Sequence, residues 1–170
     1  MKQAGHRFRE RVVRGMTAVS TRLTRARHFR GHGVHSPFVY ALVREVFMRH
    51  ELLPGDRSLY EALRSKGIAE QRAVQLQNLA IHAGLATFGL NRAEGALTVA
   101  LPGLPHDELL KLAEDAKISG AALVVMLPCV RSERQALCRQ LVAMHDSTSV
   151  DNRAYLLLFN NRLPKQHFVL

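Results

Sequence analysis

Cysteine and long apolar runs are both scarce in this sequence. The two cysteines among 170 residues, Cys129 and Cys138, have neither the paired spacing of a zinc site nor that of a disulfide framework. The longest apolar run, residues 121–130, contains Pro128 and is about half as long as the roughly 20 residues that cross a bilayer. We therefore expect no transmembrane segment, a reducing cytoplasmic location, and one domain whose core needs no disulfide.

Acidic residues are almost missing from the first 30 positions. This segment holds only Glu10 against nine lysines and arginines, which gives +8 of the formal net charge of +10. Arginines interrupt its apolar residues, so a secretory signal peptide is not expected, while an Arg-rich transit peptide stays an alternative. The pattern predicts a basic amphipathic helix over residues 1–30. Its apolar face would consist of Phe8, Val12, Met16, Val19 and Leu23.

The arginines of this helix allow three interpretations. The apolar face can pack on the rest of the protein and leave the arginines in water, the arginines can bind nucleic-acid phosphates or an acidic partner, or the helix can lie on anionic lipid. No aromatic platform for stacking on bases accompanies the charge. The candidate residues for contact with nucleic acid or membrane are Arg7, Arg11, Arg14, Arg22 and Arg25.

Residues 31–83 are predicted to form a helical region. Ser36 is typical of a helix N-cap, and Pro37 is typical of the first helical position. Apolar residues at helical spacing, interrupted by a Pro-Gly turn, predict three helices in this region. They cover residues 38–50, 58–66 and 69–82.

Residues 84–170 alternate between strand and helix patterns. The continuous apolar run at 121–127 is typical of a central strand covered on both faces. The order of elements predicts an α/β core with a mainly parallel sheet, whose last hairpin adds an antiparallel edge strand, packed with residues 31–83 as a single domain. The predicted strands are 85–90, 96–101, 121–127, 148–150, 155–160 and 166–170, the predicted helices are 105–118 and 132–144, and turns are expected at 151–153 and 160–164.

Two segments of the chain, residues 31–40 and 163–168, resemble segments of a known protein family. A bacterial group of class I S-adenosylmethionine-dependent methyltransferases has an N-terminal signature that is similar to residues 31–40, GHGVHSPFVY, and a terminal strand that resembles residues 163–168, LPKQHF. The strand at 120–125 and the helix start at 132–134 are similar to late units of the same fold. The resemblance covers residues 28–60 and 105–170. It implies a reduced Rossmann-like methyltransferase fold.

The cofactor loop that this resemblance implies is missing. In that family a glycine-rich loop follows the first strand, because glycine lets the backbone approach the methionine and ribose moieties. Here Gly31 and Gly33 follow a helix, and Gly84 and Gly89 are not followed by one. After strand 121–127, relatives that methylate amines or metal-bound catechols place Asp or Asn, whereas this chain has Leu-Pro-Cys. The comparison implies no catalytic residue and no cofactor, with S-adenosylmethionine bound only if an atypical site is retained.

The candidate pocket combines the signature loop with the loop after strand 121–127. Its histidines and serine either line a pocket or cap the following helix. His28, His32 and His35 have a spacing that can bind metal, but the glycines between them disfavour the helix that would align them, so no metal site is expected. Cys129 is either a thiolate whose pKa is lowered by the N-terminus of the following helix or, as we expect, a buried, unreactive thiol with no neighbouring base. The candidate pocket-lining residues are Gly31, His32, Gly33, His35, Ser36, Phe38, Pro128 and Cys129.

These patterns predict a methyltransferase-like protein that has lost catalysis and acts as a binding or scaffolding partner. One alternative is an active S-adenosylmethionine-dependent methyltransferase with an atypical cofactor site around residues 31–38 and Pro128. Another is an RNA-binding accessory protein that uses the basic N-terminal helix. A sheet edge left open by missing strands would favour a homodimer.

Overall fold

The computed structural model describes residues 36–127 and 131–170, without the side chain of Arg131. The predicted basic helix and its five candidate arginines therefore lie outside the described residues. The same holds for six of the candidate pocket residues, Gly31, His32, Gly33, His35, Pro128 and Cys129.

The described chain begins with the helix predicted from the Ser-Pro pair. Helix α2 (Pro37–Leu42) continues directly into the π-helical turn η1 (Val43–Phe47). The Ser36 hydroxyl accepts a hydrogen bond from the Val39 N–H at 3.4 Å, as expected of an N-cap. The helix ends near Phe47 and does not reach residue 50, because the residues from Met48 to Glu51 are exposed and offer no apolar group to the core.

The next two helices, α3 (Ser58–Ser65) and α4 (Glu70–His82), confirm the predicted segments. Helix α4 is buried along its middle, and three amide side chains there bind backbone groups of its neighbours. Asn78 accepts from the Leu53 N–H at 2.8 Å and donates to the Glu51 carbonyl at 2.9 Å. These bonds fix the irregular segment between η1 and α3 onto α4.

The remaining elements form one six-stranded sheet with two further helices. Strands β1, β2 and β3 are parallel neighbours, and the strand order across the sheet is β1-β2-β3-β5-β4-β6. The bounds are β1 (Phe88–Leu90), β2 (Leu97–Ala100), α5 (His106–Ser119), β3 (Ala122–Met126), α6 (Arg131–Met144), β4 (Ser149–Asp151), β5 (Tyr155–Leu158) and β6 (His167–Val169). The predicted strands and helices of this half are confirmed, except that the first strand begins at Phe88 and not at residue 85.

The prediction that the last strand is an antiparallel edge strand is wrong. The antiparallel strand is β5, which lies inside the sheet between β3 and β4. The edge strand β6 pairs in parallel with β4, with Ser149 opposite His167. The turn after β5 thus carries the chain past β4 and does not close a hairpin. All strands except β5 run in the same direction, so their carboxyl ends lie at one edge of the sheet.

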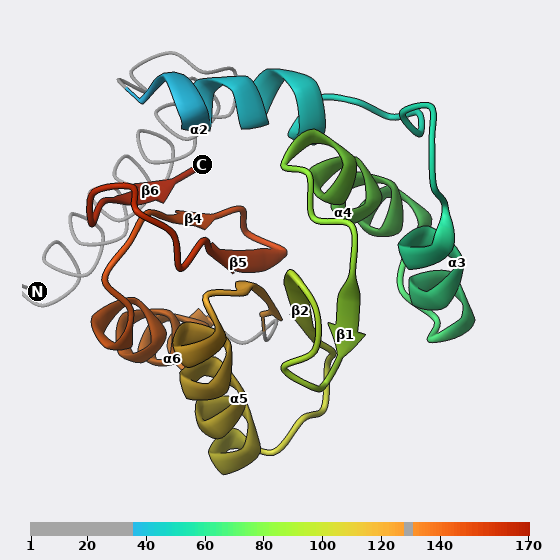
Figure 1. The fold of residues 1–170 in the computed structure, drawn as a ribbon. Coiled ribbons are helices and arrows are strands. Elements are labelled where there is room, and N and C mark those ends of the chain that lie inside the picture. Colours follow the sequence, from blue (N-terminus) through green and yellow to red (C-terminus); the bar gives the residue numbers. More distant parts are fainter. Residues whose placement is uncertain (1–35, 128–130) are drawn as a thin grey trace, which may run out of the picture.

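Helices cover both faces of this sheet (Figure 1). Helices α2, η1, α3 and α4 pack on one face in a core with Val99, Val124 and Leu157, and helices α5 and α6 pack on the other with Leu123 and Leu156. Alternate residues of β3 face opposite layers, and all five are buried, which confirms the prediction of a central strand. None of the helices in the described ranges is long and apolar enough to cross a membrane.

Candidate functional site

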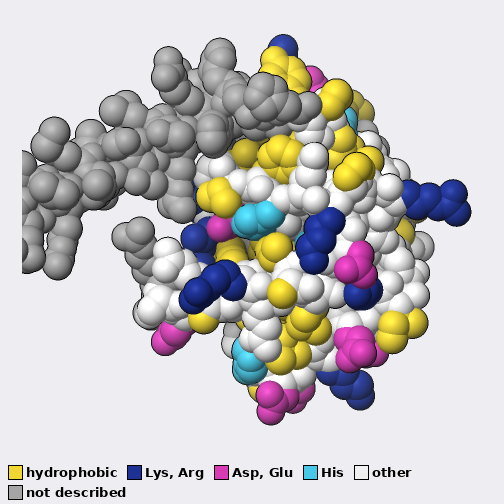
Figure 2. Space-filling model, turned by 90° about the vertical axis from the view of Figure 1, so that its left-hand side faces the viewer, with side chains coloured by type: hydrophobic (Ala, Val, Ile, Leu, Met, Phe, Trp, Pro, Cys, Tyr) yellow, Lys and Arg dark blue, Asp and Glu magenta, His cyan; other side chains and the backbone are white. Residues whose placement is uncertain are grey.

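Open α/β sheets bind ligands outside the carboxyl ends of their strands. In this sheet β4 and β6 lie beside α6, and a hollow of about 370 Å³ lies between these strands and the helix. It extends from His167, the first residue of β6, to Asp151 and Val169 at the carboxyl ends of the two strands. Because side chains alternate along a strand, Asp151 and His167 face α6, while Val150 faces the other core. The hollow is lined by Arg134, Gln135, Cys138, Arg139, Asp151, His167 and Val169. Figure 2 shows the side of the molecule on which β6 and α6 lie, with basic side chains around a histidine and apolar atoms.

Arg134 and Asp151 form an ion pair in the wall of this hollow. Their side chains are only 14% and 8% exposed. The Asp151 Oδ1 also accepts the Arg153 N–H at 3.0 Å, and the Arg134 Nε donates to the Arg153 carbonyl at 3.2 Å. The pair therefore connects the first turn of α6 to the link between β4 and β5. Each charge has a hydrogen-bonded partner, as a buried charge requires.

Cys138 lines the same hollow as a neutral thiol. The residue is 7% exposed. Burial, assisted by the negative charge of Asp151, raises the pKa of the Cys138 thiol to about 11. Since the thiolate is the nucleophilic form, this cysteine is unreactive at physiological pH.

His167 and Ser149 face each other across β6 and β4. The His167 Nδ1 lies 2.8 Å from the Ser149 Oγ, and the same hydroxyl donates a longer bond of 3.4 Å to the Gln166 carbonyl. This arrangement fits a His167 ring that donates from Nδ1. Burial lowers the pKa of His167, and Asp151 opposes that shift. Ser149 is fully buried and does not line the hollow, so its hydroxyl is not placed to attack a ligand there.

The two described residues of the predicted pocket lie elsewhere. Ser36 caps α2, and the Phe38 ring packs edge-to-face on Phe159 with a centroid distance of 4.8 Å. Neither residue lines the hollow beside α6. Of the two interpretations of Ser36, pocket lining or helix capping, its observed hydrogen bond is that of a helix cap. Phe38 packs against the core between the sheet and helices α2 to α4.

Sequence reasoning missed the polar groups that the structure brings together. The prediction of a turn over residues 151–153 is correct only in part, because Asp151 is the last residue of β4 and residues 152–154 make the connection to β5, with Arg153 at a φ of 45°. The partner of Asp151 is 17 positions away on α6, a separation that local patterns do not report. The sequence signal for this site was weak: an acidic residue next to a short strand pattern, residues 148–150, of which only Val150 is apolar.

A second buried polar chain joins the helical layer to the sheet. The Gln75 Nε2 donates to the Phe47 carbonyl at 3.0 Å, and its Oε1 accepts from the Tyr155 hydroxyl at 3.1 Å. Asn152 in turn donates to the Tyr155 oxygen at 2.9 Å. Burial raises the pKa of the Tyr155 phenol, so it stays protonated and donates. This chain of bonds is complete, as the interior position of its members demands.

The connection between β1 and β2 contains no helix. Parallel neighbours usually need a crossover of a dozen or more residues, but here residues 91–96 alone return the chain to the start of β2. Asn91, at a φ of 54°, starts the reversal, and its side chain accepts the Leu101 N–H at 2.7 Å. A side chain at Gly89 would place its Cβ 2.4 Å from the Arg92 carbonyl oxygen. The link is therefore too tight to receive a ligand between its backbone and β1.

Within residues 36–127 and 131–170, no group of three or more His, Cys, Asp or Glu side chains is placed to hold a metal ion. Comparisons with protein-family models, with curated proteins and with solved structures find no match to this chain.

Proposed function

We propose that this chain is a cytoplasmic, methyltransferase-like protein that does not catalyse methyl transfer and acts as a binding or scaffolding partner. The observation that carries the proposal is the direct link from β1 to β2. In the family that the two end segments resemble, the cofactor loop is glycine-rich and follows the first strand of the sheet. In this chain the first described strand of the sheet, which lies outside the two resembling segments, is followed by a close-packed return, without a helix whose N-terminus could face a ligand.

The side chains in and beside the hollow next to α6 support a role without catalysis. Arg134 and Asp151 are committed to each other, the Cys138 thiol is protonated, and the Ser149 hydroxyl is buried. An activated nucleophile needs a neighbouring base or a lowered pKa. The pKa of the Cys138 thiol is raised, and the Ser149 hydroxyl, although 2.8 Å from the His167 Nδ1, is buried and does not line the hollow. These groups can recognise a partner by hydrogen bonding, but they are not arranged for group transfer.

The proposal is tested by isothermal titration of the full chain with S-adenosylmethionine and, separately, with S-adenosylhomocysteine. We expect no binding heat at millimolar ligand with protein that unfolds cooperatively, which shows that the sample is folded. Stoichiometric binding of either compound would contradict the proposal and favour the active enzyme with an atypical site.

A second candidate function rests on the charge of residues 1–30, which carry +8 of the net charge of +10. This density of arginine favours contact with nucleic-acid phosphates, whose counterions are released on binding. Replacement of Arg7, Arg11, Arg14, Arg22 and Arg25 by glutamine in the full chain should then abolish retention on an RNA column at low salt. Unchanged retention of the variant would exclude this use of the segment.

A further inference from the structure

A cavity of about 250 Å³, here named the α5–α6 cavity, lies between α5 and α6, which Figure 1 shows side by side. Leu158, which lines it, pairs with Leu123 near the start of β3 and with Ser149 at the start of β4. The cavity is therefore at the amino ends of these two strands, and it shares no lining residue with the hollow beside α6. Its lining consists of Ala113, Glu114, Lys117, Leu141, Met144, His145 and Leu158.

His145 brings a hydrogen-bond donor to this mainly apolar space. The residue is 2% exposed, and its Nδ1 accepts the Ser147 N–H at 3.2 Å, so Nδ1 carries no proton. Burial, and then the charge of Lys165, lowers the pKa of His145 to about 4, which keeps the ring neutral at physiological pH. A neutral ring without a proton on Nδ1 carries it on Nε2. The buried Nε2 is thus a donor, and none of the described residues accepts its hydrogen bond.

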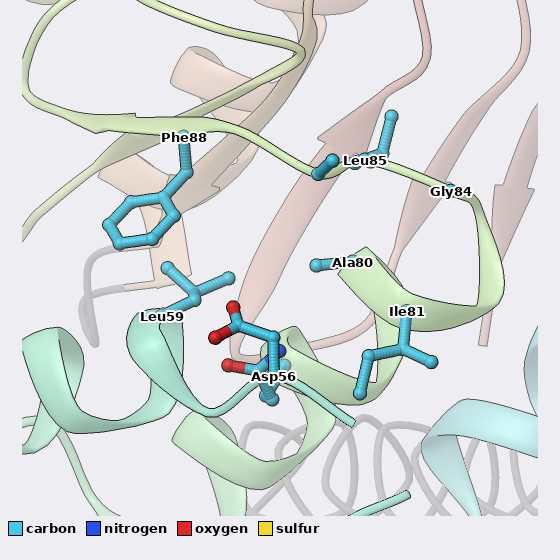
Figure 3. Close-up of a pocket in the computed structure, with 9 residues that line it drawn as sticks. Asp56, Leu59, Ala80, Ile81, Gly84, Leu85 and Phe88 are labelled. Atoms are coloured by element: carbon cyan, nitrogen blue, oxygen red, sulfur yellow. The ribbon is translucent and has the colours of Figure 1, made fainter. Parts of the chain in front are cut away.

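The other mainly apolar cavity, drawn in Figure 3, has no such group. It lies where α3 and α4 meet the chain that enters β1, with Leu59 and Phe88 on one side and Leu85 on the other. The Asp56 carboxylate at this cavity is bonded to the Ser58 N–H and hydroxyl, and no buried polar side-chain atom of its lining lacks a partner. Of these two cavities, the α5–α6 cavity alone combines apolar space with an unsatisfied buried donor.

The charged side chains near His145 favour neither sign of ligand charge. Lys117 forms an ion pair with Asp146 at 2.6 Å. Lys165 is close enough to disfavour a charged imidazole ring, and Glu114 lines the cavity from an exposed position of α5. Two positive and two negative charges therefore surround the site. A charged ligand would lose its hydration there without a surplus of opposite charge to replace it.

We infer that the Nε2–H of His145 is turned to the α5–α6 cavity, and that the cavity binds a small, uncharged, mainly apolar molecule with a hydrogen-bond acceptor, such as a carbonyl oxygen, at one end. Ser147 does not line the cavity, so the ring edge that is free to face it is the one that carries Nε2. The apolar part of the ligand packs on Leu141 and Leu158. Because Nε2 is covered, the half-buried Met144, whose unbranched chain adapts readily, moves aside as the ligand enters.

The first test is long-range ¹H–¹⁵N NMR of the histidine rings in the full chain at pH 7, which distinguishes protonated from unprotonated ring nitrogens. We expect His145 to carry its proton on Nε2, and we expect cyclohexanone at millimolar concentration to shift the Nε2 signal. A proton on Nδ1 would overturn the inference. The absence of any shift would also overturn it, because the cavity would then hold water only.

Two charged probes of similar size test the specificity. Cyclohexanecarboxylate carries a negative charge, and protonated cyclohexylamine has no acceptor. We expect each to bind about tenfold more weakly than cyclohexanone, the effect of roughly one hydrogen bond. Equal or tighter binding of either charged probe would contradict an uncharged acceptor as the ligand group.

Variants at His145 separate its two ring nitrogens, with binding followed through the backbone amide signals of Leu141 and Leu158. His145→Asn keeps an acceptor toward Ser147 but has no donor at the Nε2 position, and should weaken cyclohexanone binding about tenfold. His145→Gln places an amide N–H near the Nε2 position and should retain binding. Equal affinities of the two variants would overturn the inference.

A further pair of variants tests the location. Ala113→Leu fills the cavity from α5 and should abolish binding, whereas the matched variant Ala136→Leu, at an exposed position of α6 outside the lining, should retain it. Cooperative unfolding in urea shows that each variant is folded. Full binding to folded Ala113→Leu would contradict the proposed location. The inference does not rest on the proposed function, because it involves neither S-adenosylmethionine nor the hollow beside α6.

Discussion

The ion pair between Arg134 and Asp151 is almost out of contact with water, and each charge is compensated by the other. Arg134→Gln would leave the Asp151 carboxylate buried without its cation. We expect a loss of about 3 kcal/mol or more in the free energy of unfolding, as for other broken buried pairs. Urea denaturation measures this loss. The control is Arg49→Gln, which removes an exposed pair with Glu45 and should cost roughly 0.5 kcal/mol or less. A similar small loss for both variants would show that the buried pair does not hold α6 to the β4–β5 link.

His145 makes the stability of the fold depend on pH. The residue is 2% exposed, its Nδ1 accepts the Ser147 N–H at 3.2 Å, and its Nε2 has no partner among the described residues. Burial and then the charge of Lys165 lower the pKa of His145 from 6.5 to about 4. The folded state therefore favours the neutral ring. Its contribution to stability is complete above pH 6.5 and is lost as the pH falls from 6.5 toward 4.

Between pH 7 and pH 5 we expect the free energy of unfolding to fall by about 2 kcal/mol through His145 alone. The variant His145→Asn keeps a hydrogen-bond acceptor near the Nδ1 position but does not titrate. Urea denaturation at the two pH values should therefore show a smaller decrease for the variant. Parallel pH dependence in the two proteins would mean that His145 is already solvated when folded.

At the scale of elements, the link between β1 and β2 depends on the close approach at Gly89. Gly89→Ala would bring a Cβ to 2.4 Å from the Arg92 carbonyl, a backbone atom that cannot move without opening the link. We expect a loss of roughly 1–3 kcal/mol, typical of an overpacked site. Gly84→Ala is the control, because its Cβ meets no atom within 4 Å and its cost comes only from the positive φ of 67°. Thermal unfolding should rank Gly89→Ala as the less stable variant.

Helices and strands were predictable where the spacing of apolar residues and the Gly or Pro residues that mark element ends agree. Ser36 and Pro37 located the start of α2, and the unbroken run to Leu127 located the central strand. The parallel pairing of β6 with β4 was not predictable, because the short strands after α6 carry no local signal of which neighbour they pair with. The same limit applied to the sites. His145 was visible only as the residue after a helix, since apolar periodicity does not show that a polar residue is buried.

At the scale of the whole molecule, β1 leaves one edge of the sheet open within the described residues. The Thr87 carbonyl accepts the Leu97 N–H of β2, and the Asn91 N–H donates to the Val99 carbonyl of β2. Because successive residues of a strand point their backbone groups to opposite sides, the N–H of Leu90 points away from β2. An unpaired strand edge is a template for a second copy. Because β1 has only three residues, we expect a weak homodimer that forms at high protein concentration.

Light scattering over a concentration series measures this association, with the mass expected to rise toward twice that of the chain. Leu90→Pro removes the outward N–H of β1, a position where proline is tolerated in an edge strand, and should keep the protein monomeric. Val169→Pro removes an N–H at the opposite edge, on β6, and should leave the dimer intact, because the Leu170 N–H and the Gln166 carbonyl make the bonds to β4. A monomer at every concentration would contradict the expectation. Loss of the dimer only in Val169→Pro would assign the contact to the β6 edge, next to α6 and its hollow, and would make that hollow part of an interface between two copies.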